Sequence, residues 1–173
     1  YRQLLGQCVD GNGLKACLKR IPEADKAGVL AVDIAEKYQQ VGLYAQAVAW
    51  VKKYYPSSRD PALLATLAQS MTFLSDQEQR RAMEDAEVWL KAQPQDARLL
   101  LHLGQMAYWK ELWGKAQSYL EASLSIQPSL QAHLALAKVY DDTGKPTEAE
   151  AQRQQALRLM ADDEHDLPAV MAV

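Results

Sequence analysis

The stretch from Ala97 to Pro128 constrains the fold of this chain more than any other. Its defining residues stand at fixed places when Ala97 is counted as place one: Leu103 at 7, Gly104 at 8, Ala116 at 20, Leu120 at 24 and Pro128 at 32. Two antiparallel helices approach closely where small residues such as Gly104 and Ala116 face each other. Pro128 cannot continue the second helix because it lacks a backbone N–H. One such hairpin cannot bury its own apolar face, so it requires neighbouring hairpins.

This spacing is typical of the tetratricopeptide repeat (TPR), a helix-turn-helix unit of about 34 residues. The same places recur along the chain, which predicts an all-α fold, a TPR-like right-handed helical solenoid of antiparallel helix pairs. The expected repeats are about 23–56, 61–94, 97–128 and 130–160, after a partial hairpin over 1–22. The predicted TPR-like domain therefore spans 1–160. We expect the acidic segment 161–173 to be a disordered tail.

Residues that end helices, cap helices or form turns refine these boundaries. Pro56 is expected to end the second repeat, and Asp60 to cap the next helix. The run Asp10-Gly11-Asn12-Gly13 is interpreted as a turn, because the residues that would follow it in a calcium-binding EF-hand are wrong. Arg153 stands where a large apolar residue is usual, as expected of a last helix whose outer face has no neighbour to cover it.

Composition excludes several classes of protein. The 173 residues carry 19 basic and 22 acidic side chains, a formal charge of −3, which does not favour nucleic-acid binding. No apolar run approaches the roughly 18 residues of a membrane-spanning helix. Cys8 and Cys17 lie nine apart, a spacing that predicts neither a metal site nor a disulfide framework. The chain begins with Tyr1 rather than Met, so we expect it to be a piece of a longer protein.

The repeat register predicts a binding surface. In each unit, places 2, 5, 9, 12 and 13 of the first helix are expected to line a concave groove. The candidate binding residues there are Phe73, Arg98, Gln105, Tyr108, Trp109 and Lys138. Three aromatic rings beside two cations could hold an extended peptide, an acidic segment or a flat anionic ligand. The alternative is that each ring packs on the adjacent first helix.

The sequence offers one candidate haem ligand and no motif of a known enzyme class. His102, one turn from Met106, is a candidate haem ligand, although packing or hydrogen bonding is the commoner role of a lone histidine. The sequence contains no GxSxG, no HExxH and no phosphate-binding glycine-rich loop. We therefore expect no catalytic residues, no metal and no resident cofactor.

Three segments resemble the C-terminal region of the bacterial HemY family, inner-membrane proteins associated with haem biosynthesis. They are LWGKAQSYLEASLSIQP (112–128), AEVWLKAQPQDARLL (86–100) and LALAKVYDDTGKPTEAE (134–150). The resemblance implies an N-terminal pair of membrane helices absent from this chain, a repeat domain on the cytoplasmic side and no catalytic residues. The matching residues mostly serve helix packing, so the resemblance locates no binding site.

Together these observations predict a non-catalytic TPR platform at the bacterial inner membrane, associated with late haem biosynthesis. Its expected partners are proteins, with haem-synthesis enzymes as candidates. The alternative is that the same groove binds haem or a porphyrin and passes it on.

Overall fold

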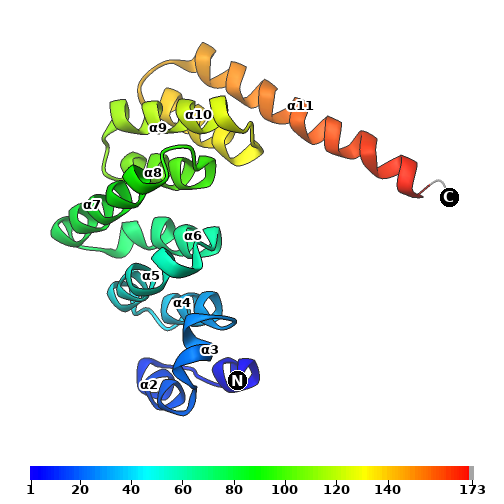
Figure 1. Cartoon of the computed structure of the whole chain (residues 1–173). Helices are drawn as coiled ribbons and strands as arrows, with labels where there is room; N and C mark the ends of the chain where they lie inside the picture. The colour runs from blue at the N-terminus through cyan, green and yellow to red at the C-terminus, as the bar shows by residue number, and fades with distance from the viewer. Residues whose placement is uncertain (172–173) are drawn as a thin grey trace. The chain divides into compact units, whose positions relative to one another are not determined.

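The computed structural model describes the backbone of residues 1–171 and the side chains of residues 1–163. This part of the chain contains helices and no strands (Figure 1). In chain order the α-helices are α1 (Arg2–Gly6), α2 (Gly11–Arg20), α3 (Glu23–Ala27), α4 (Ala31–Gln40), α5 (Tyr44–Ser58), α6 (Pro61–Ser70), α7 (Asp76–Ala92), α8 (Ala97–Trp109), α9 (Trp113–Ile126), α10 (Leu130–Asp142) and α11 (Pro146–Met171). A 3-10 turn, η1 (Met71–Phe73), follows α6. The chain divides into two compact units, Tyr1–Trp89 (unit 1) and Leu90–Val173 (unit 2).

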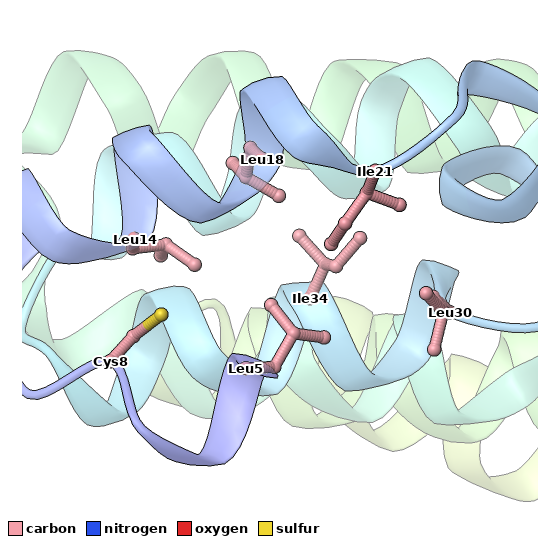
Figure 2. Close-up of a cluster of buried hydrophobic side chains, with 7 residues drawn as sticks. All are labelled: Leu5, Cys8, Leu14, Leu18, Ile21, Leu30 and Ile34. Atoms are coloured by element: carbon pink, nitrogen blue, oxygen red, sulfur yellow. The ribbon is translucent and has the colours of Figure 1, made fainter. Parts of the chain in front are cut away.

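Unit 1 begins with a hairpin of two short helices that pack on α4. Figure 2 shows Leu5, Leu14, Leu18 and Ile21 gathered around Ile34 of α4, and all five side chains are buried. Apolar residues recur every three or four positions in α2 and α4, which gives each helix one buried face. Because α1 and α2 meet here, this cluster is the core of the N-terminal end of the unit.

The two cysteines contradict the prediction drawn from their spacing. Cys8 follows α1, Cys17 lies in the middle of α2, and the two form a disulfide. A separation of nine residues fits no sequence signature, but the hairpin folds these two positions onto each other. Their pairing therefore depends on tertiary structure.

Two further expectations for unit 1 are wrong. Gly11, Asn12 and Gly13 form the first turn of α2 rather than a loop, because the Asp10 carboxylate caps that helix by accepting a hydrogen bond from Gly13 N at 2.7 Å. Pro56 lies inside α5, which continues to Ser58. A proline in the last turn removes only one backbone hydrogen bond. The helix ends at Ser58 instead, followed by Arg59, which has a left-handed φ of 55°.

Helices α4, α5 and α6 of unit 1 pack on one another. The first helix expected after Pro22 is divided into α3 and α4 by a turn over residues 28–30. Helix α4 packs on α5, and α5 packs on α6. Asp60 caps α6 as predicted, accepting from Ala62 N at 2.9 Å. Tyr55 of α5 contacts Trp89 of α7 with ring centroids 4.6 Å apart.

Unit 2 consists of two longer helix pairs, α8 with α9 and α10 with α11. At the first seam, a Cβ atom built on Gly104 would lie 2.6 Å from Leu120 Cγ, so only glycine permits the observed approach. Ala116 and Leu120 are fully buried there. The spacing of Gly104, Ala116 and Leu120 is the feature from which this packing was predicted.

The end of unit 2 differs from expectation. A disordered tail was expected from residue 161, whereas α11 continues as a helix to Met171; the last two residues of the expected tail, 172 and 173, lie outside the described part of the chain. No glycine or proline interrupts residues 147–167, so the local sequence does not stop the helix. Arg153 of α11 donates to Asp141 of α10 at 2.7 Å and to Glu150 at 3.0 Å. An ion pair thus occupies the place where an apolar contact is usual.

Candidate functional site

Helix α8 carries most of the predicted binding residues on one face. Arg98, Gln105 and Trp109 are separated by seven and four residues, a spacing that aligns side chains along a helix. Asp96 caps the start of α8 by accepting hydrogen bonds from Arg98 N at 3.2 Å and Leu99 N at 3.1 Å. The helix ends at Trp109. The face therefore has a cation at its first turn and a tryptophan at its last.

The tryptophan end of this face is an aromatic cluster. Trp109 and Trp113 both meet Tyr108 edge-on, with ring centroids 5.3 Å and 5.6 Å away. The Tyr108 hydroxyl donates a hydrogen bond to the Asp142 carboxylate at the end of α10. This bond holds the tyrosine between two helix pairs of unit 2, while Trp109 remains 47% exposed. The cluster therefore presents a large apolar ring to solvent on a fixed support.

The environment of Tyr108 disfavours its ionised form. The hydrogen bond to Asp142 raises the pKa of Tyr108 to about 12, with burial and the nearby carboxylate charges acting in the same direction. The phenol is thus a neutral donor across the physiological range.

The candidate haem ligand, His102, shares this face by its spacing, four residues after Arg98 and three before Gln105, but it is buried. His102 is only 9% exposed, and its Nδ1 lies 2.9 Å from Gln105 Oε1. Since an amide oxygen can only accept, Nδ1 carries the proton in this pair and the lone pair is on Nε2. Burial lowers the pKa of the His102 imidazole below its usual value, and the positive charge of Arg98 acts in the same direction, against the hydrogen bond to Gln105. His102 is therefore a buried, neutral histidine with one nitrogen able to bind a metal.

The other predicted residues have different environments. Arg98 and Lys138 are exposed, Lys138 on α10. Leu101 was expected in the groove from its place in the repeat, but it is buried. Phe73 belongs to unit 1, where it is 61% exposed and stacks in parallel on Tyr44 with ring centroids 4.0 Å apart. The candidate site therefore consists of the unit 2 residues, and Phe73 belongs to a separate aromatic pair with the half-buried Tyr44.

Sequence reasoning missed the partners that hold these aromatic rings. Tyr44 was not identified because it opens a second helix, a place with no expected role in the groove. Asp142 was placed on the groove by register, but its bond to Tyr108 was not foreseen. Both pairs join residues about 30 positions apart, so the only signal available was the length of the repeat itself.

The described residues contain neither a metal-binding cluster nor a membrane-spanning helix. No group of three or more histidine, cysteine, aspartate or glutamate side chains among them is placed to hold a metal ion. Among the described helices, none combines the length and apolar character that crossing a bilayer requires.

Comparison with known proteins identifies the fold. The chain is similar to a crystal structure of MamA (18% identity, 89% of this chain and 88% of that one, TM-score 0.60). It is also similar to a thermophilic TPR protein of Thermus thermophilus (21% identity, 93% and 86%, TM-score 0.67) and to residues 41 to the end of MamA from Desulfovibrio magneticus RS-1 (16% identity, 94% and 94%, TM-score 0.61). No protein-family model and no curated protein matches the sequence. The predicted fold class, an all-α TPR-like helical solenoid, is confirmed.

Proposed function

We propose that this chain is a non-catalytic interaction module that binds a partner protein through the α8 face of unit 2. The observation that carries the proposal is Trp109, a 47% exposed tryptophan whose ring is supported by Tyr108. Tryptophan is one of the residue types enriched among those that dominate the binding energy of protein interfaces. A TPR fold suits this role, because its repeated helices present extended surfaces.

The polar groups of the face define how a partner would be oriented. Arg98 lies eleven residues from Trp109, about 16 Å along the helix axis at 1.5 Å per residue. A bound segment would therefore place an apolar side chain on Trp109 and a carboxylate near Arg98, with Gln105 between them. Lys138 on α10 would add a second contact for acidic groups. An extended peptide of about five residues covers this distance.

The cellular role is the part of the proposal that rests on the HemY resemblance. We propose that the module works at the bacterial inner membrane, on its cytoplasmic side, where it holds enzymes of late haem synthesis. The membrane attachment would come from an N-terminal region outside this chain.

The second candidate function is binding of haem or a porphyrin by the same face. The His102–Gln105 pair favours it, because a donor bond from Nδ1 is the usual way in which proteins orient a histidine that binds metal through Nε2. Trp109 and Tyr108 would contact the macrocycle, and Arg98 would pair with a propionate. His102 would have to be uncovered for its Nε2 to reach the iron.

Variants of the α8 face test the first function. Trp109→Ala and Arg98→Glu alter the α8 face, while Leu157→Ala and Arg158→Glu make matched changes at exposed positions of α11. Each purified protein is used to capture membrane proteins and is then titrated with each captured enzyme. Trp109→Ala is expected to weaken binding roughly tenfold or more, the effect of a central interface tryptophan.

The α11 variants are expected to bind like the unmodified chain. Equal binding by all variants, or losses confined to the α11 changes, would refute the α8 face as the binding surface. A saturable shift of the haem Soret band, lost in His102→Ala, would instead establish the second function.

A further inference from the structure

The helices of the N-terminal hairpin are too short to be stable by themselves. Helix α1 has five residues and α2 has ten, whereas isolated helices shorter than about 12 to 15 residues are marginal in water. The loop between them spans only residues 7–10. Stability of this hairpin must therefore come from packing on α4 and from the covalent link between Cys8 and Cys17.

The hairpin covers an apolar face of unit 1. Ile34 and Leu30 are buried beneath it, at 0% and 4% exposure, and Tyr38 and Trp50 pack at the margin of the same cluster. Figure 2 shows Cys8 at one end of this cluster beside Leu14. Detachment of the hairpin would uncover these side chains.

We propose that Cys8 and Cys17 form a redox-controlled lock, whose reduction loosens the α1–α2 hairpin and exposes the apolar face of α4. Cys8 is 3% exposed, whereas Cys17 is only partly buried. An incoming thiolate therefore reaches Sγ of Cys17 first. The S–S bond breaks, Cys8 leaves as a thiolate and takes up a proton, and a mixed disulfide remains at Cys17.

A second thiol of the reductant completes the exchange. It attacks the mixed disulfide and releases Cys17, so that the chain gains two electrons and two protons while the reductant becomes a disulfide. The reverse reaction, with a disulfide as oxidant, closes the lock. Cytosolic thiols are normally kept reduced, so on the cytoplasmic side of a membrane this pair would close only under oxidising conditions.

The disulfide stabilises the closed hairpin mainly by lowering the conformational entropy of the opened one. Cross-linking a loop of this size restricts the opened chain, and the chain-entropy relation predicts a change in the opening equilibrium of up to about 100-fold. The affected amides are those of α2 and of residues 31–38 in α4. Helices α8 and α9 contain no cysteine and should not respond.

Amide hydrogen exchange tests the proposal on the unmodified chain. One sample is oxidised with oxidised glutathione, the other is kept in dithiothreitol, and both are quenched with an acid-active phosphine so that the same peptides are recovered. Protection over residues 11–20 and 31–38 is expected to fall on reduction, by up to about 100-fold, with no change in α8. Thiol titration should give no free thiol in the first sample and two per chain in the second.

The Cys8→Ala/Cys17→Ala variant supplies the control. It should exchange like the reduced chain whether or not reductant is present. Two free thiols per chain after oxidation, or equal protection of α2 in the two samples of the unmodified chain, would overturn the proposal even if the variant failed to fold.

Discussion

The two units use the same repeat in different ways. Unit 2 is made of four helices of 13 residues or more, whose seam is closed by the Gly104–Leu120 contact. Unit 1 begins with four helices of ten residues or fewer and gathers side chains of α1 and α2 around Ile34 of α4, with a disulfide beside them. Long helices can rely on close packing of backbones, whereas short ones need a central side chain and a covalent link.

The largest expected effect comes from truncating the central residue of each core. Leu120→Ala and Ile34→Ala each remove a fully buried side chain, and such changes cost about 2–5 kcal/mol of unfolding free energy. We expect Leu120→Ala to lie at the upper end, because the two long helices at Gly104 cannot close the cavity. The short helices α1 and α2 can move toward the space left at Ile34. Urea unfolding of both variants measures the costs.

An equal cost at the two positions, or a larger one at Ile34, would contradict this comparison. It would mean that the N-terminal helices are held as rigidly as the seam of unit 2.

The same contrast explains what could be predicted from the sequence. The seam of unit 2 depends on small residues at fixed places, so Gly104, Ala116 and Leu120 identified it directly. The N-terminal hairpin depends on the Cys8–Cys17 bond, which no spacing encodes, and on Asp10 as a helix cap, a local signal hidden by the Gly-Asn-Gly run that follows it. The capping residue converts a run that resembles a turn into the first turn of a helix.

The candidate site was predictable in part for a related reason. Register placed Arg98, Gln105 and Trp109 on one face, because the period of an α-helix fixes which residues share a side. Register did not reveal that Leu101 is buried, since burial depends on the helices packed against it. Which partner holds each ring, such as Tyr44 beneath Phe73, likewise follows from tertiary contacts alone.

A substitution at the unit 2 seam sharpens the comparison. In Gly104→Ala the new Cβ would meet Leu120 Cγ at 2.6 Å, and overpacking of this kind costs about 1–3 kcal/mol. Gly114→Ala is the matched control, because a Cβ there meets no atom of the described residues within 4 Å. The control should be neutral or stabilising by less than about 1 kcal/mol. Thermal unfolding of both variants gives the difference, and equal stabilities would show that Gly104 is not a packing requirement.

Substitutions in the turns between helices are expected to change stability by a smaller amount, in both units. Gly42 in unit 1 and Gly144 in unit 2 have φ values of 79° and 74°, and Glu111 occupies the equivalent turn with φ of 58°. A left-handed conformation costs a residue with a side chain about 1 kcal/mol. Glu111→Gly should therefore stabilise the chain by less than about 1 kcal/mol, after the greater freedom of glycine in the unfolded state is subtracted.

Gly42→Ala and Gly144→Ala should each destabilise by about 1 kcal/mol. Differential scanning calorimetry resolves changes of this size in matched samples. A lower transition temperature for Glu111→Gly would contradict this prediction. It would mean that the contacts of the Glu111 side chain stabilise the fold by more than the left-handed backbone at this position destabilises it.

The smallest expected effect is a pH dependence that belongs to unit 2. Place six of the repeat is buried in both units, but it holds Thr66 in unit 1 and His102 in unit 2. Only the histidine titrates near neutral pH. Burial depresses its pKa in the folded chain, so its neutral form contributes stability that is fully present above the unfolded pKa of about 6.5. Below that pH the unfolded chain binds a proton that the folded chain does not, and stability is lost until the pH passes the folded pKa.

His102→Gln removes this linkage while keeping a polar side chain of similar length. Carboxylates elsewhere respond to acid in both proteins, so the informative quantity is the difference between their unfolding free energies at about pH 7.5 and at about pH 5. We expect the unmodified chain to lose more stability than the variant over this interval. Parallel pH profiles would mean that His102 takes up its proton as readily in the folded chain as in the unfolded one. The imidazole would then be accessible to water, and the same accessibility would favour the haem-binding alternative over a purely structural histidine.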